Sequence, residues 1–195
     1  MKNKMAILIA GFLLSLNLNA QTELSLNISN LLINEANFVL EKGVQENLSI
    51  GVFASYVYGL PPTDNIQFLN NNFYFGPEVR YYVSPKNGLD LFFIGLYLKE
   101  AIGTVNLNDN YYDYYGIPPT NSGTSMTYSK LAFGLNIGSK WITRNNITYG
   151  MNFGIGRNLY SSYSNEALRD YYFDQNTIAK YFDFRFGFNI GFRFK

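Results

Sequence analysis

The sequence predicts an all-β fold, an eight-stranded antiparallel up-and-down transmembrane β-barrel. Apolar and polar residues alternate with a period of two in most segments, as they do in strands that have one apolar and one polar face. Aromatic residues reach 18% and charged residues only 15%, against roughly 25% charged residues in an ordinary soluble domain. Short and long connections also alternate along the chain, which is typical of barrels that span a membrane.

The N-terminus has the features of an export signal. Lys2 and Lys4 form a charged start, residues 5–16 an apolar run, and residues 19–21 a cleavage region that contains Ala20. The apolar run is shorter than the roughly 20 residues that a membrane-spanning helix needs, although a retained single-helix anchor is the alternative. We therefore expect a cleaved signal peptide over residues 1–20 and one barrel domain over residues 21–195.

Composition argues against several classes of function. Without Lys2 and Lys4, the 15 basic residues fall to 13 against 14 acidic ones, so the mature net charge is −1 and offers no basic surface for nucleic acid. The chain has neither Cys nor His, which removes thiolate metal sites, disulfides and the commonest general base. We expect no cofactor, no metal and no enzymatic activity, with a carboxylate pair such as Asp109 and Asp113 as the remaining alternative.

The first four strands are predicted at residues 24–32, 36–41, 48–58 and 72–83. In the last of these, Phe73, Phe75 and Val79 alternate with polar residues that include Glu78. Pro77 interrupts this strand, and because proline cannot donate a hydrogen bond to the ladder, we expect a β-bulge there.

The last four strands are predicted at residues 89–100, 128–141, 147–155 and 182–194. The terminal strand has the most regular alternation, since its odd-numbered residues are polar or Gly and include Asp183, Arg185 and Arg193. Its even-numbered residues are Phe182, Phe184, Phe186, Phe188, Ile190, Phe192 and Phe194. The strand at 89–100 is the least regular, because Leu91 and Phe93 make both faces apolar.

The connections separate into two kinds. Short ones, rich in turn-forming residues, are predicted at 43–47, 84–88 and 143–146, and long ones at 59–71, 101–125 and 161–180. The first hairpin, near residues 34–35, is the exception, because it is a short connection on the side of the barrel where the long connections are expected. Hydrocarbon supplies no hydrogen-bond partners for backbone groups, so spanning strands must close into a barrel. A soluble lipocalin-like barrel is the alternative, with apolar lumen and polar exterior.

The alternation of inward and outward positions along each strand, its parity, places nine charged side chains in the lumen. They are Glu41, Glu78, Arg80, Lys99, Lys130, Lys140, Asp183, Arg185 and Arg193. The interior of an eight-stranded barrel is just wide enough for side chains, so we expect these charges to plug it. Lys99, Lys130, Lys140 and Arg193 are expected near the mouths in contact with water. The deeper ones must pair, because an isolated buried charge is costly, and a proton or ion path is the alternative.

The lumen charge network predicted from this pattern contains the following residues: Glu41, Glu78, Arg80, Asp183 and Arg185.

Several segments resemble a family of small outer-membrane barrels of unknown function that share the architecture of OmpA-like transmembrane domains. The matching segments are Phe38-Val39-Leu40-Glu41, Leu48-Ser49-Ile50-Gly51, Phe75-Gly76-Pro77-Glu78-Val79-Arg80-Tyr81-Tyr82, Phe133-Gly134-Leu135-Asn136-Ile137-Gly138 with Trp141, and Phe153-Gly154-Ile155-Gly156-Arg157. The terminal strand is similar to the signal that the barrel assembly machinery recognises, through Phe188, Ile190, Phe192 and Phe194. The resemblance implies an outer-membrane location and no catalytic residues.

We therefore expect a monomeric outer-membrane protein whose partners are the lipid bilayer, lipopolysaccharide and the barrel assembly machinery. Its expected role is structural, in the cell envelope, with loops exposed at the surface. A binding or adhesion function is the alternative, because rigid amphipathic rings make good contact residues. The candidate contacts are Tyr111, Tyr112, Tyr114 and Tyr115. A narrow pore is a further alternative.

Overall fold

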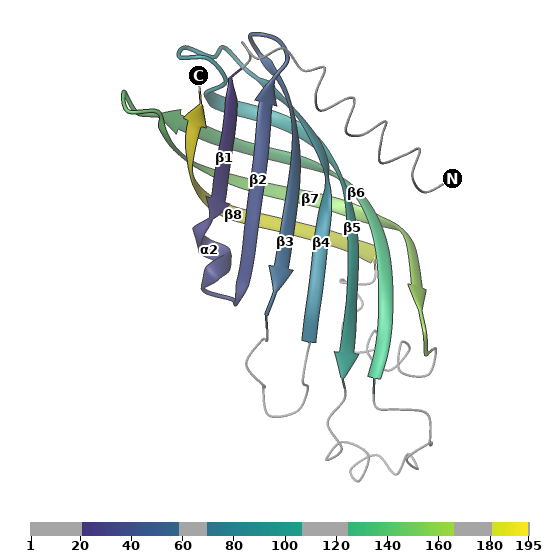
Figure 1. Ribbon diagram of the computed structural model, residues 1–195. Coiled ribbons are helices and arrows are strands. Elements are labelled where there is room, and N and C mark those ends of the chain that lie inside the picture. The colour runs from purple at the N-terminus through teal and green to yellow at the C-terminus, as the bar shows by residue number, and fades with distance from the viewer. Residues whose placement is uncertain (1–20, 59–69, 107–124, 166–180, 195) are drawn as a thin grey trace, which may run out of the picture.

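Eight antiparallel strands close into a barrel in which each strand pairs with its neighbour in sequence and the last pairs with the first (Figure 1). This computed structural model describes residues 21–58, 70–106, 125–165 and 181–194. The strands are β1 (Thr22–Asn27), β2 (Glu35–Gly43), β3 (Leu48–Val57), β4 (Asn70–Tyr82), β5 (Leu91–Asn106), β6 (Ser125–Ile142), β7 (Ile147–Tyr163) and β8 (Phe182–Phe194). A short helix, α2 (Ile28–Leu31), follows β1. The predicted eight-stranded antiparallel barrel is confirmed.

The alternation of side chains gives this barrel an apolar exterior. The seven outward side chains of β8, Phe or Ile at each position, are between 45% and 56% exposed. The residues between them face the lumen, where Gly187 and Arg193 are buried. The outward positions of β6 and β7 follow the same rule, with Ile137 and Phe153 exposed. The predicted direction of these faces is therefore confirmed.

Glycines on the inner face of β6 make room for the large rings of β5. A Cβ atom at Gly134 would lie 2.5 Å from Cζ of Tyr97, and one at Gly138 would lie 2.6 Å from Cζ of Phe93. Tyr97 and Phe93 are almost completely buried. Small residues on one wall thus accommodate aromatic residues from the next strand, which fills the lumen.

The first strand is shorter than predicted. Residues 28–31 form α2 in place of the expected continuation of a strand over 24–32. The side-chain oxygen of Asn27 accepts hydrogen bonds from the main-chain N–H groups of Ser29 (3.1 Å) and Asn30 (3.3 Å), which is the N-cap arrangement that begins a helix. This local bond competes with the strand ladder and ends it.

The bulge expected at Pro77 is absent, so that prediction is wrong. β4 keeps one register against β5 on both sides of Pro77, and the irregularity lies instead between Asn70 and Phe73. A side chain at Gly76 would overlap the main-chain carbonyl oxygen of Leu98. The missing Cβ lets the two strands approach closely there. The pairs with β5 are interrupted at Gly76 and Pro77 and resume at Glu78 in the same register, so no residue is inserted.

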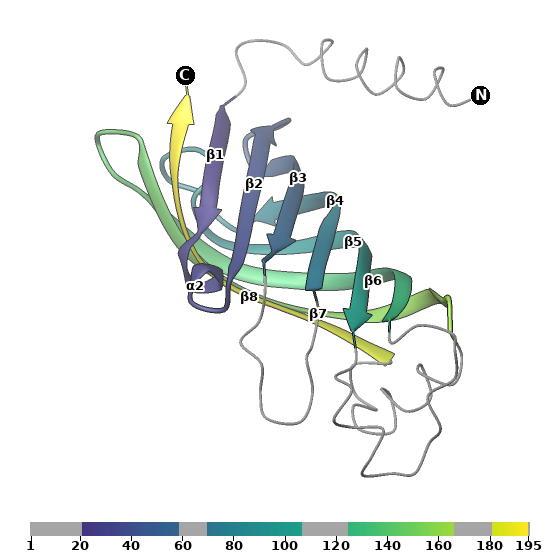
Figure 2. The same cartoon turned by 60° about the horizontal axis from the view of Figure 1, so that its bottom comes forward.

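The connections between strands divide the barrel into two ends. The turns at 44–47, 83–90 and 143–146 lie at the end where β1 begins and β8 finishes, which we call the turn end (Figures 1 and 2). The other connections leave from the opposite end, the loop end. Strands β5 and β7 continue toward it as far as Asn106 and Tyr163, so parts of the predicted loops 101–125 and 161–180 are strand.

Candidate functional site

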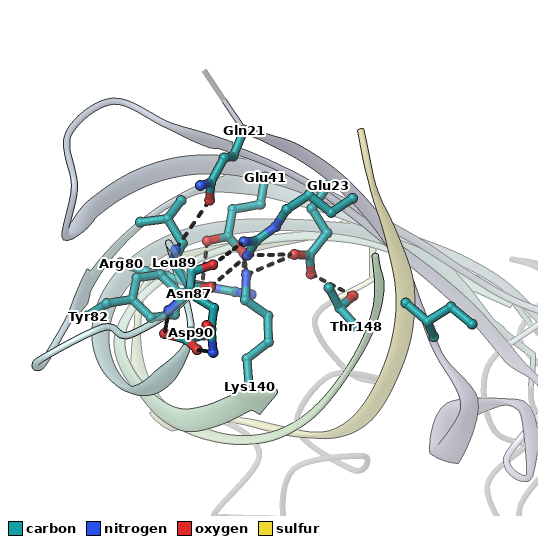
Figure 3. Close-up of polar contacts among 12 residues, drawn as sticks. Gln21, Glu23, Glu41, Arg80, Tyr82, Asn87, Leu89, Asp90, Lys140 and Thr148 are labelled. Atoms are coloured by element: carbon teal, nitrogen blue, oxygen red, sulfur yellow. Dashed lines mark hydrogen bonds and ion pairs between the residues drawn. The ribbon is translucent and has the colours of Figure 1, made fainter. Parts of the chain in front are cut away.

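Charged side chains from six strands meet inside the barrel and form one continuous series of contacts along its length. These side chains occupy the inward positions of β1, β2, β4, β5, β6 and β8, and the register between strands sets which of them meet. Figure 3 shows the part of this series of contacts that lies near the turn end. We call the whole set the lumen network.

Glu41 is the centre of the lumen network at the turn end (Figure 3). Its carboxylate accepts hydrogen bonds from Nη1 of Arg80 at 2.8 Å, Nζ of Lys140 at 2.9 Å and the hydroxyl of Tyr82 at 2.7 Å. All four side chains are buried. Two cations and a phenol therefore share one carboxylate, which ties β2 to β4 and β6.

Glu23 extends the lumen network toward the turns. Its carboxylate lies 3.1 Å from Nζ of Lys140 and 3.5 Å from Nη2 of Arg193, and it accepts a hydrogen bond of 3.0 Å from the hydroxyl of Thr148. Arg193 also donates to two main-chain carbonyl oxygens of the turn 83–90, at 3.0 and 2.8 Å. These contacts join β1, β6, β7 and β8 to that turn and fill the turn end of the lumen.

The middle of the lumen network lies between Arg80 and Arg185. Glu78 pairs with Nη2 of Arg80 and, at 3.3 Å, with Nη1 of Arg185. The Arg185 guanidinium also lies over two rings, 3.9 Å from the centroid of Phe53 and 4.8 Å from that of Tyr97. Cation–π contacts of this kind are worth about 0.5–2 kcal/mol, more where water is excluded.

The lumen network ends near the loop end at Asp183. Its carboxylate accepts a hydrogen bond of 2.6 Å from Nζ of Lys99 and one of 2.8 Å from the hydroxyl of Tyr97. Lys99 lies 4.6 Å from the ring centroid of Tyr74. Lys130 lies further toward the loop end than Asp183, with its Nζ atom 5.3 Å from the ring centroid of Tyr128.

Alternating charge signs hold the lumen network together. A buried ion costs several kcal/mol unless an opposite charge and further hydrogen bonds compensate it, and each carboxylate here contacts at least one cation. The members in order from the turn end are Arg193, Glu23, Lys140, Glu41, Arg80, Glu78, Arg185 and, through Tyr97, Asp183 and Lys99. The arrangement can cross-link strands and block the lumen.

The structure brings together the residues predicted for the lumen. Glu41, Glu78, Arg80 and Arg185 are linked by direct ion pairs, and Asp183 joins them through Tyr97. The expectation that water solvates Lys140 and Arg193 is wrong, because they are only 5% and 4% exposed. Both pair with Glu23, which was not among the predicted lumen residues, and Lys140 also pairs with Glu41.

Glu23 was missed because the first strand was predicted to begin one residue later. The alternation of Leu24 and Leu26 with Ser25 and Asn27 continues back to Glu23, which gives it the inward parity. The roles of Tyr82 and Tyr97 had no comparable signal, since tyrosine occurs on both faces of this barrel. Pairing between particular charges depends on the register between distant strands, which strand parity alone does not determine.

The other predicted residues are placed differently. Phe188, Ile190, Phe192 and Phe194 project from the exterior of β8 and are 45%, 45%, 46% and 48% exposed. Tyr111, Tyr112, Tyr114 and Tyr115, like Asp109 and Asp113, lie outside the described residues. A function for them therefore stays a prediction.

Two features do not occur among the residues that the structure describes. No group of three or more of their acidic side chains converges so as to hold a metal ion. No helix formed by them is long and apolar enough to cross a membrane. Comparisons with protein-family models, curated proteins and solved structures find no match to this chain.

Proposed function

We propose that this chain is an integral outer-membrane protein with a structural role in the cell envelope. Residues 1–20 direct its export, and the barrel assembly machinery inserts residues 21–195, with Phe188, Ile190, Phe192 and Phe194 as part of the recognised strand. The barrel is a monomer in contact with lipid and lipopolysaccharide, its loops are at the cell surface, and it performs no catalysis.

The observation that carries this proposal is the polarity of the barrel wall. Large apolar side chains cover the exterior of the strands, whereas the lumen holds the ionic network. A soluble barrel would need the opposite arrangement. Since complete burial of a Phe or Ile side chain is worth about 1.5–3 kcal/mol, moving a half-exposed one into hydrocarbon gains roughly 1 kcal/mol. Many such positions favour a bilayer over water.

Membrane fractionation of the full chain, expressed in a Gram-negative host, tests the proposed location. We expect the protein in the outer-membrane fraction and extractable only with detergent. Unboiled and boiled samples should migrate differently on a gel, because a closed barrel resists unfolding by detergent. Recovery of the folded protein in detergent-free buffer would contradict the proposal.

A pair of arginine substitutions tests which surface meets lipid. Ile137→Arg puts a charge on the exterior of β6, where the side chain is 45% exposed, and should destabilise the barrel by about 2–4 kcal/mol if that position lies near the bilayer midplane. Asn145→Arg, in the exposed turn 143–146, is the control and should change stability little. Urea unfolding in lipid vesicles measures both. Equal stability of the two variants would indicate that Ile137 faces water.

The structural role is distinguished from loop-mediated binding by a loop deletion. A strain that lacks the chain should become more sensitive to bile salts or large antibiotics, and the intact gene should restore resistance. We expect a variant in which a short turn replaces residues 106–124 to restore it as well, because the barrel wall is unchanged. Failure of a correctly inserted deletion variant to restore resistance would favour the binding function.

A further inference from the structure

The barrel wall has a seam at which two strands face one another without pairing. Residues 189–192 of β8 pair with both β7 and β1, but residues 182–188 pair with β7 alone among the described strands. On the other side of the seam, residues 35–37 of β2 pair only with β3. Helix α2 lies between these two edges (Figure 2).

Two side-chain contacts hold α2 against the edge of β8. The amide group of Asn27 donates a hydrogen bond of 3.1 Å to the carbonyl oxygen of Phe186, and the hydroxyl of Ser29 accepts one of 3.1 Å from the N–H group of Phe188. After the helix, Leu32 and Ile33 are 86% and 53% exposed. The seam is thus bridged by side chains and has an apolar outer surface.

A cavity of about 560 Å³ opens at the seam and reaches into the lumen. This volume is within the range of about 300–1,000 Å³ typical of small-molecule sites. Its lining is divided by polarity. Leu32, Ile33, Phe184 and Phe186 contribute the outer, apolar part, and Lys99 and Arg185 contribute to the inner part.

Cations line the inner part of the cavity, whereas the carboxylates that pair with them, Glu41, Glu78 and Asp183, are not among its lining residues. The cations are Arg80, Lys99 and Arg185, and Glu35, the one acidic residue among the described residues that line the cavity, accepts a hydrogen bond from Ser55. Among the described residues, Arg185 makes a single hydrogen bond, from Nη1 to Glu78. A guanidinium carries five N–H donors, so Arg185 retains capacity to bind a carboxylate or phosphate, which are its preferred bidentate partners.

We propose that the seam cavity binds an anionic amphiphile, with its carboxylate or phosphate head on Arg185 and Lys99. Its acyl chain lies along Leu32, Ile33, Phe184 and Phe186, toward the outside of the barrel. Both a phospholipid of the bilayer and a free fatty acid have this chemistry. Entry of the ligand from the bilayer rests on the proposed membrane location, whereas binding itself depends only on the cavity.

Native mass spectrometry of the purified chain in a non-ionic maltoside detergent tests the binding site, independently of where the protein resides in the cell. The probes are sodium laurate, dioleoylphosphatidylglycerol and uncharged dodecanol. We expect a saturable one-to-one complex with an anionic probe and at least tenfold weaker binding of dodecanol. Binding of laurate alone would identify a free amphiphile as the ligand, and binding of phosphatidylglycerol alone a bilayer lipid.

Three variants separate the site from the rest of the barrel. Arg185→Gln removes the head-group contact and should weaken anionic binding at least tenfold. Asn37→Phe fills the cavity from β2 without changing any charge and should have the same effect if Arg185→Gln fails to fold. Arg144→Gln, in the exposed turn 143–146 at the opposite end, should bind like the unchanged protein. Equal binding of charged and uncharged probes, no binding, or unchanged binding in both cavity variants would overturn the proposal.

Discussion

Glu41 contacts two buried cations and a buried phenol in the lumen. Arg80 and Lys140 both donate to its carboxylate, and the hydroxyl of Tyr82 supplies a third hydrogen bond. The side chain is 3% exposed, so neither cation can replace this carboxylate with bulk water. Loss of the negative charge leaves two buried cations with fewer compensating contacts.

Glu41→Gln should therefore lower the free energy of unfolding by about 3–5 kcal/mol, the usual cost of breaking a buried ion pair from one side. Glu46→Gln is the matched control, because Glu46 is exposed in the turn 44–47 and should have little effect. Urea titration in lipid vesicles, followed by the fluorescence of the single Trp, measures both. Coincident unfolding curves for the two variants would show that the pairs of Glu41 contribute no net stability.

Strand β1 and helix α2 act as one closing element of the barrel. All six residues of the strand pair with β8 on one side, and five of them pair with β2 on the other. Its last residue, Asn27, both caps α2 and donates to the carbonyl oxygen of Phe186. One side chain thus links the end of the strand, the start of the helix and the unpaired edge of β8.

Asn27→Ala should destabilise this closure. Removal of an N-cap side chain costs about 1 kcal/mol, and the carbonyl of Phe186 also loses a donor, so we expect about 1–3 kcal/mol in total. The exposed Asn145→Ala is the control. Hydrogen exchange should show faster exchange at the Phe188 amide, which donates to Ser29, than in the unchanged protein. Equal protection of that amide in both variants would mean that α2 does not depend on Asn27.

The lumen network determines what can pass through the barrel. At the turn end, Glu23, Glu41, Lys140 and Arg193 are buried and in mutual contact. Since an eight-stranded barrel is just filled by its own residues, we expect these side chains to leave no continuous path for hydrated ions.

Planar-bilayer recordings of the reconstituted chain should therefore show no channel openings. Glu78→Ala, which removes the partner of Arg80 and Arg185, should reduce stability by several kcal/mol without creating conductance. A variant that conducts ions and remains as stable as the unchanged protein would support the narrow-pore alternative.

The sequence predicts some parts of this barrel better than others, for physical reasons. The strand at 182–194 has the predicted bounds, because its seven alternate apolar residues mark the outward face along its whole length and leave the other face to the lumen. The end of β1 could not be found in the same way, since the N-cap of Asn27 is a local hydrogen bond without periodicity. Inward charges follow from parity alone, but the contacts of Glu41 with Arg80 and Lys140 require the register of β2, β4 and β6.

The wall of the barrel is uneven in height around its circumference. β6 has 18 residues, whereas β1 has only six before α2 begins, and a tilted strand needs about 9–11 residues to cross a hydrocarbon layer. In a bilayer, lipids beside β1 would therefore meet a lower apolar wall than lipids beside β6. Because membranes adapt to such mismatch by local thinning, we expect an asymmetric lipid annulus, with head groups drawn inward on the β1 side.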